Sequence, residues 1–152
     1  MDEPRDRVAV VYQPIVSLTT GDMIGWEALT RGTDETPFAS PLALFSFAAE
    51  VDALDVLERI CREEALRQGR SLPPGCKLFL NVTPRSFADP PFVKGDTAEW
   101  LRQWGLAPYD VVLEITEHGA IDYRKCRQVL DRYRSQGFLI ALDDFGAGHA
   151  DL

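Results

Sequence analysis

The chain has 152 residues, of which 45% are hydrophobic and 26% are charged, and its formal net charge is −8. These values are typical of one soluble globular domain, and the negative charge argues against a nucleic-acid polymer as a partner, because binding to its phosphate backbone needs a basic face. No apolar run approaches the about 20 residues that cross a bilayer, and residues 1–7 form a charged tail rather than a signal peptide, so we expect a cytoplasmic protein without direct membrane insertion.

The first third of the chain predicts two strands followed by helical structure. Residues 8–16 and 23–29 are rich in β-branched and apolar side chains, and a turn signal separates them, so the two strands could pair as a hairpin. Residues 41–69 predict one helix or two, because apolar side chains recur there at three- and four-residue spacing. These apolar positions are Leu54, Leu57, Cys61 and Ala65.

Short apolar strands alternate with helices in the rest of the chain. The predicted strands are 77–82, 111–115 and 138–142, and the predicted helices run from 96 toward 104 and from 122 to 137. Alternation of this kind is typical of the α/β class with a parallel sheet, and near-continuous apolar strands are typical of strands buried on both faces. No internal domain boundary is predicted.

Carboxylate and amide side chains fall at or near the ends of the predicted strands. They are Glu27, Asn81, Glu114 and Asp143, and Asp144 follows the last of them. Functional groups of α/β barrels gather where strands run into the following loops. Because these side chains offer only oxygen atoms, they predict one shared site for a hard cation such as magnesium or manganese rather than structural zinc. Each residue taken alone could instead be a solvated loop residue, a cap or a turn residue.

The roles of three side chains depend on their surroundings. Arg31 could hold a phosphate by a two-pronged contact or form a surface salt bridge. Glu117 could support the neighbouring loop or be solvated. Asp144 can share a site with Asp143 only if the strand has already ended, because neighbouring strand residues point to opposite faces.

Five motifs in one order carry a resemblance to a known family. They are Tyr12-Gln13-Pro14-Ile15, Trp26-Glu27-Ala28-Leu29-Thr30-Arg31, Asn81-Val82-Thr83-Pro84, Glu114-Ile115-Thr116-Glu117 and Asp143-Asp144-Phe145-Gly146-Ala147-Gly148. From about Val8 to Leu152 the chain resembles the EAL-domain family, which contains cyclic di-GMP phosphodiesterases. The resemblance implies a modified TIM barrel whose first strand is antiparallel to the others.

The resemblance also implies an activity and a role for each site residue. Active family members hydrolyse cyclic di-GMP to linear pGpG with metal-activated water, using magnesium or manganese. By resemblance, the first metal would be bound by Glu27, Asn81, Glu114 and Asp143, and Asp144 would help to bind a second. Cyclic di-GMP would be contacted by Gln13, Leu29 and Arg31. Glu117 would brace the loop from Asp144 to Leu152.

The family pattern continues past Leu152 with a lysine and further glutamates, including the general base, so no general base is assignable here. About five strands are predicted, whereas a closed TIM barrel has eight. We therefore expect a tail at 1–7 and an incomplete EAL-type domain at 8–152, truncated and inactive alone. An unpaired sheet edge predicts association with another copy. The alternatives are a non-catalytic cyclic di-GMP sensor, a protein-interaction module, or a self-associating structural fragment.

Overall fold

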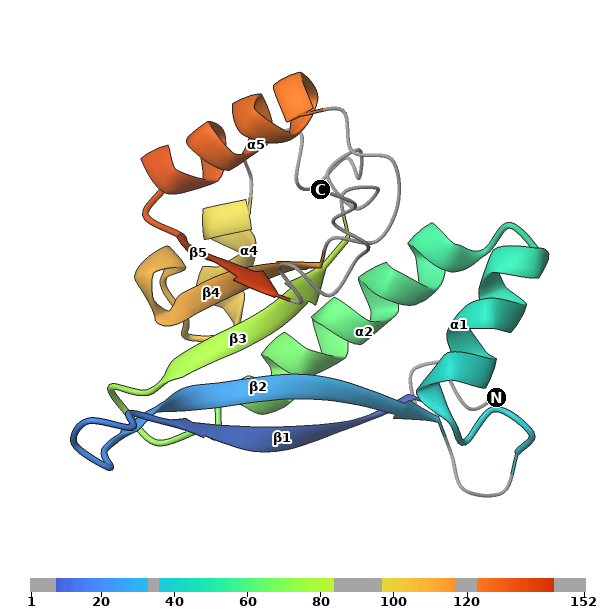
Figure 1. Ribbon diagram of the computed structural model, residues 1–152, viewed down its shortest axis with the longest axis horizontal. Coiled ribbons are helices and arrows are strands. Elements are labelled where there is room, and N and C mark those ends of the chain that lie inside the picture. The colour runs from blue at the N-terminus through green and yellow to red at the C-terminus, as the bar shows by residue number, and fades with distance from the viewer. Residues whose placement is uncertain (1–7, 33–35, 84–96, 117–122, 144–152) are drawn as a thin grey trace, which may run out of the picture.

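The computed structural model describes residues 8–32, 36–83, 97–116 and 123–143 (Figure 1), although the side chains of some residues in these ranges, including Asp143, are not described. One five-stranded sheet follows the order of the chain, with β1 (Val8–Val16), β2 (Met23–Gly32), β3 (Lys77–Val82), β4 (Val111–Thr116) and β5 (Leu139–Asp143). β1 is antiparallel to β2, and every later neighbour is parallel. The predicted α/β class with an antiparallel first strand is confirmed, as an open sheet.

Helices connect the parallel strands. They are α1 (Pro41–Glu50), α2 (Leu54–Gly69), α4 (Thr97–Gln103) and α5 (Tyr123–Ser135), and a short 3₁₀ helix, η3, covers Pro108–Asp110. The stretch predicted at 41–69 is two helices, because the chain turns between them at Asp52, whose φ is 54°. The predicted starts at 96 and 122 lie outside the described residues. In the part of the chain that is described, no helix is both long and apolar enough to cross a membrane.

The helices cover one face of the sheet. Strand residues alternate between two faces, so the register assigns each residue to a face. Ala28, Leu80 and Leu113 are neighbours across β2, β3 and β4, and all three are buried in the main core. The helices add Ala65 and Leu66 of α2, Leu101 of α4 and Tyr133 of α5 to the same core. Figure 1 shows α2 running along the sheet and α5 beside β5.

The predicted end of the second strand at residue 29 is three residues too early. β2 continues to Gly32, because β1 pairs with it along its whole length, from Val8 opposite Gly32 to Val16 opposite Met23. The parallel pairing with β3 covers only Gly25 to Ala28. Glu27 therefore lies inside β2, near the point where its pairing with β3 stops. β5 likewise ends one residue later than predicted, at Asp143.

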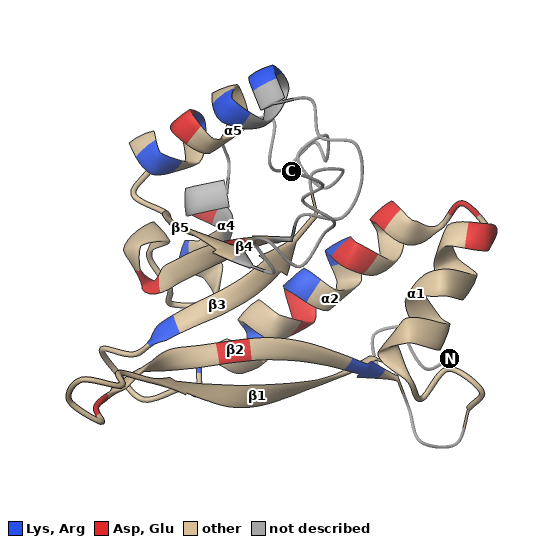
Figure 2. Ribbon diagram, viewed as in Figure 1, with Lys and Arg blue, Asp and Glu red and all other residues tan. Residues whose placement is uncertain are grey.

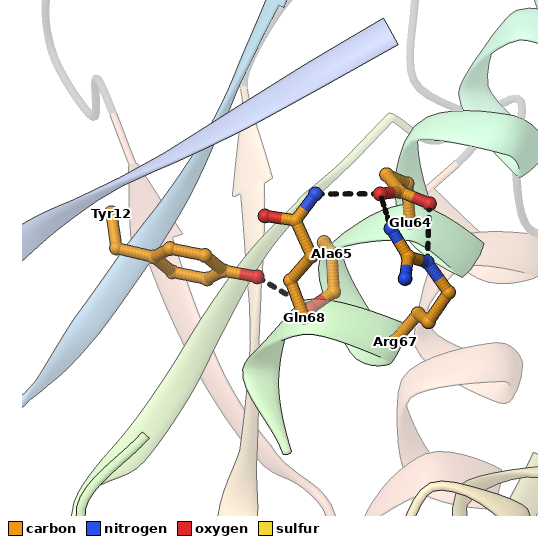
Figure 3. Close-up of polar contacts among 5 residues, drawn as sticks. All are labelled: Tyr12, Glu64, Ala65, Arg67 and Gln68. Carbon is orange, nitrogen blue, oxygen red and sulfur yellow. Dashed lines mark hydrogen bonds and ion pairs between the residues drawn. The ribbon is translucent and has the colours of Figure 1, made fainter. Parts of the chain in front are cut away.

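Tyr12 connects β1 to α2. Its hydroxyl donates a hydrogen bond to the backbone carbonyl of Ala65, with an O···O distance of 2.7 Å, beside a cluster in which Glu64 accepts hydrogen bonds from Arg67 and Gln68 (Figure 3). Burial raises the pKa of Tyr12 above its ordinary value of 10.0, and the charge of Glu64 raises it further. The phenol therefore stays protonated in the folded chain at a pH where it ionises in the unfolded chain.

Replacing Tyr12 by Phe is expected to lower the free energy of unfolding by about 1 kcal/mol near neutral pH, because one hydrogen bond is lost. The pKa of Tyr12 is higher in the folded chain than in the unfolded chain, so Tyr12 stabilises the fold fully below pH 10.0. This stabilisation is lost as the pH rises through the folded-state pKa, because ionisation then favours the unfolded chain. The difference in unfolding free energy between the unmodified chain and Tyr12→Phe should therefore shrink above pH 10.0. Urea unfolding at about pH 7 and about pH 10.5 measures it.

Tyr109→Phe is the matched control for this prediction, because Tyr109 is an exposed tyrosine and its aromatic ring is retained. Its unfolding free energy should follow that of the unmodified chain at both pH values. Equal pH dependence of the unmodified chain and Tyr12→Phe would contradict the prediction.

Candidate functional site

The predicted site residues that the structure describes occupy strand positions on the face opposite the helices. Gln13 lies directly opposite Glu27, and Asn81 lies directly opposite Glu114. The strand partner of Glu114 is Ala141, two residues before Asp143. Leu29 and Arg31 follow Glu27 at intervals of two and four residues, which keeps them on the same face of β2. The fold therefore brings the predicted positions of all five strands to one side of the sheet.

Glu27 and Asn81 are in direct contact, although they are 54 residues apart in the sequence. Asn81 Nδ2 donates a hydrogen bond to Glu27 Oε1 at 2.8 Å. Glu27 lies beside Phe79 in the register, and Asn81 is the next residue of β3 on the same face. Glu114, on the next strand, has a buried Oε2 atom. Three adjacent strands thus place these carboxylate and amide side chains at neighbouring positions on one face of the sheet.

Gly25 lets β2 approach β3 two residues before Glu27. A Cβ atom at this position would lie 2.3 Å from the backbone oxygen of Lys77 and 2.8 Å from the ring of Phe79. No real side chain tolerates a backbone atom that close, so glycine is required here. The close approach of the two strands helps to hold Glu27 within hydrogen-bonding distance of Asn81.

The described side chains offer oxygen ligands of the kind that hard divalent cations prefer, although they form only part of a ligand set. Among the residues that the structure describes, no three His, Cys, Asp or Glu side chains form a group that could hold one metal ion. Asn81 is an additional oxygen donor, and its amide would have to turn Oδ1 toward a cation, because its NH₂ group cannot ligate. The Asp143 side chain, Asp144 and Glu117 lie outside the described part, so their predicted roles stay predictions.

A cavity of about 210 Å³ opens at the carboxyl ends of β2 and β3, beside α1 and α2. It brings together the three predicted residues Leu29, Arg31 and Asn81, whereas Gln13, Glu27 and Glu114 do not line it. The guanidinium of Arg31 donates through Nη1 to the backbone carbonyl of Thr30 at 2.8 Å. The cavity therefore places a cationic side chain close to one of the candidate metal ligands.

Sequence reasoning missed the charged residues of α2 that line this cavity. Glu58 and Arg62 are only 6% and 4% exposed. Thr83, just after β3, donates its hydroxyl to Glu58 at 2.9 Å, and Arg62 Nη1 lies 3.9 Å from Glu58 Oε2. Figure 2 shows acidic and basic residues together along α2. The available signal was a Glu–Arg pair at four-residue spacing next to the apolar positions of the helix.

The comparisons with known proteins agree on one family. The EAL domain family matches residues 4–152. Protein Rv1354c of Mycobacterium tuberculosis, which is uncharacterized, is 35% identical over 153 residues, covering 95% of this chain and 24% of the relative. The probable cyclic di-GMP phosphodiesterase PdeN of Escherichia coli is 29% identical over 153 residues, covering 97% of this chain and 29% of the relative. The chain thus spans less than a third of the length of these relatives.

Solved structures give the same result. The manganese and cyclic di-GMP complex of Klebsiella pneumoniae BlrP1 superposes with a TM-score of 0.80 at 29% identity, covering 100% of this chain and 38% of that protein. A calcium and cyclic di-GMP complex of BlrP1 superposes with a TM-score of 0.76 at 28% identity, covering 99% and 42%. The sheet order, the clustered acidic positions and the family match lead to one conclusion, that this chain belongs to the EAL domain family.

Proposed function

We propose that the chain is part of a divalent-metal-dependent phosphodiesterase domain that hydrolyses cyclic di-GMP to linear pGpG. The observation that carries the proposal is the contact between Asn81 and Glu27, because it joins two candidate metal ligands from separate strands at 2.8 Å. Glu114, Asp143 and Asp144 would complete the set, with magnesium or manganese as the cation. PdeN is named as a probable phosphodiesterase of this substrate, and BlrP1 was solved with manganese and cyclic di-GMP.

The residues of the chain would divide the work by their chemistry. When bound, a divalent cation neutralises charge on the phosphoryl oxygens and acidifies a water molecule. Glu27, Asn81 and Glu114 would hold the cation and fix its place on the sheet. Arg31 would contact a phosphate of the ligand through its planar guanidinium, and Leu29 and Gln13 would contact the rest of the ligand.

The experiment supplies cyclic di-GMP with manganese or magnesium to this chain and to the longest protein that its gene encodes. Calorimetry measures binding, and chromatography measures pGpG. We expect metal-dependent binding by both and pGpG from the longer protein. Saturable binding by both without pGpG would favour the sensor alternative. Absence of binding with either metal would contradict both functions. Association with a second copy was also predicted, and it stays a prediction.

Replacing Arg31 by Ala is expected to weaken cyclic di-GMP binding by about 10- to 100-fold. A hydrogen bond to a charged group contributes about 1.5–3 kcal/mol, and each 1.4 kcal/mol corresponds to a factor of about ten. Titration of the chain with cyclic di-GMP in the presence of manganese measures the change. Arg31→Lys should recover little of the loss, because an ammonium group cannot make the two-pronged contact.

The matched control is Arg70→Ala, which removes the same charge from an exposed residue just after α2. Its affinity for cyclic di-GMP should stay within about twofold of the unmodified chain, because exposed charges separated from a ligand are screened by salt. If Arg31→Ala and Arg70→Ala bind the ligand equally well, Arg31 is not a ligand contact.

A further inference from the structure

α2 contacts the ends of the two strands that carry Glu27 and Asn81. Thr83, two residues after Asn81, donates its hydroxyl to both carboxylate oxygens of Glu58, at 2.9 and 3.1 Å. One helical turn later, Cys61 is buried, and it lines the same cavity as Thr30, three residues after Glu27. Burial raises the pKa of the Cys61 thiol, so the thiol stays neutral there. One face of α2 therefore holds both strand ends.

The Glu58–Arg62 pair is unusual, because charged side chains are rarely this buried. Both side chains are nearly fully buried, at 6% and 4% exposure. Removing two charges from water costs free energy that their mutual attraction often does not recover, so buried pairs contribute little net stability. Such a pair can instead fix one geometry among several, which is a specificity role. Glu58 contacts the end of β3 at Thr83, so this strand end is what the pair would hold in one geometry.

Asn81 depends on that strand end for its position. Its side chain is exposed, so packing does not hold it, and its amide donates a hydrogen bond to Glu27. Val82, between Asn81 and Thr83, is 1% exposed and anchors the opposite face of the strand in the core. Pairing of Asn81 with Glu114 and of Val82 with Ile115 fixes the β3 backbone on the side of β4, whereas its pairing with β2 stops at Leu80. On the side of α2, the hydrogen bond from Thr83 to Glu58 holds the end of β3 beyond Asn81.

We propose that Glu58 and Thr83 are positioning residues, which act through the end of β3 to hold Asn81 beside Glu27 in the candidate metal site. The effect on metal binding rests on the proposed function, whereas the effect on the Asn81–Glu27 hydrogen bond does not. The contacts run from Glu58 to Thr83, along two residues of backbone to Asn81, and from Asn81 Nδ2 to Glu27 Oε1. Neither Glu58 nor Thr83 needs to touch the cation or the ligand.

The test uses Thr83→Val, which keeps the shape of the side chain and removes the hydroxyl, and Thr83→Ser, which keeps the hydroxyl. Calorimetry with Mn²⁺ alone, far below the unfolding temperature, measures metal affinity. The ¹⁵N and ¹H signals of the Asn81 side-chain amide, recorded without metal, report its hydrogen bond to Glu27. We expect about tenfold weaker Mn²⁺ binding and shifted Asn81 signals in Thr83→Val, since partners outside the ligand shell commonly contribute 10–100-fold to affinity. Thr83→Ser should recover both.

Glu64→Gln is the matched control, because Glu64 is on the same helix, is 7% exposed and accepts hydrogen bonds from Arg67 and Gln68 of that helix. It should lower the unfolding temperature without changing Mn²⁺ affinity or the Asn81 signals. Thr83→Ala also removes the hydroxyl, and it replaces Thr83→Val if the latter does not fold.

The outcomes separate this inference from the proposed function. Unchanged Asn81 signals and unchanged Mn²⁺ affinity in Thr83→Val would overturn the positioning role while the metal site stands. Failure of the unmodified chain to bind Mn²⁺ would overturn the metal site. In that case the Asn81 signals still decide whether Thr83 positions the amide, and signals equal to those of the unmodified chain would overturn that role as well.

Discussion

Replacing Glu27 by Gln is expected to weaken Mn²⁺ binding to the chain by at least about 100-fold. The substitution keeps an oxygen that can accept the hydrogen bond from Asn81 Nδ2, so the contact between β2 and β3 can remain. What is lost is the negative charge, and hard cations are bound mainly by carboxylate charge. Partners outside the ligand shell already contribute about 10–100-fold, so loss of a charged ligand belongs at or above the upper end of that range.

Calorimetric titration with Mn²⁺ measures this effect, and two further variants make it specific. Glu50→Gln removes the same charge from an exposed residue at the end of α1 and should bind Mn²⁺ like the unmodified chain. The double variant Glu27→Gln with Asn81→Asp moves the carboxylate across the 2.8 Å contact to β3. It should recover part of the affinity, because the total charge of the pair is restored. Equal affinities of Glu27→Gln and the unmodified chain would exclude Glu27 as a ligand.

The strands were predictable from sequence because their apolar runs are local signals, but the length of β2 was not. Residues 30–32 of β2 pair with the start of β1 rather than with β3, so the strand outlasts its apolar pattern. In the sequence Thr30-Arg31-Gly32, threonine favours a strand but glycine disfavours one, so the local signal for extension is weak. Pairing between chain segments that are distant in sequence supplied the reason, and a prediction from single-residue patterns does not contain it.

The site was predictable as a set of positions and not as a set of contacts. Polar residues at or near predicted strand ends, together with the family motifs, indicated Glu27, Asn81 and Glu114 as candidates, and the register places them on one face. Glu58 and Arg62 were missed because charged residues on a helix are usually solvated. Their burial arises where α2 crosses the ends of two strands, and Thr83 satisfies the carboxylate there. A helical pattern cannot show which charged positions a later strand will cover.

Replacing Leu78 by Ala is expected to lower the free energy of unfolding by about 2–5 kcal/mol, the usual range for a buried leucine in a core. Leu78 is 1% exposed on β3 and fills the space beside Gly69, where an added Cβ would lie 2.8 Å from Leu78 Cδ2. The glycine has no side chain that could move into the resulting cavity, so we expect a loss in the upper half of that range. Such a loss is a large part of the about 5–15 kcal/mol that stabilises a typical domain.

Leu18→Ala provides the matched comparison, because Leu18 is 100% exposed and the same atoms are removed without leaving a cavity. Its unfolding free energy should change by no more than about 0.5 kcal/mol. Urea unfolding of both variants measures the difference, and equal midpoints would show that the helix layer does not pack on β3 as described. Since β3 also carries Asn81, Mn²⁺ affinity of the folded Leu78→Ala chain should fall with the packing that fixes this strand. The core below the sheet and the site above it would then depend on the same six residues, Lys77–Val82.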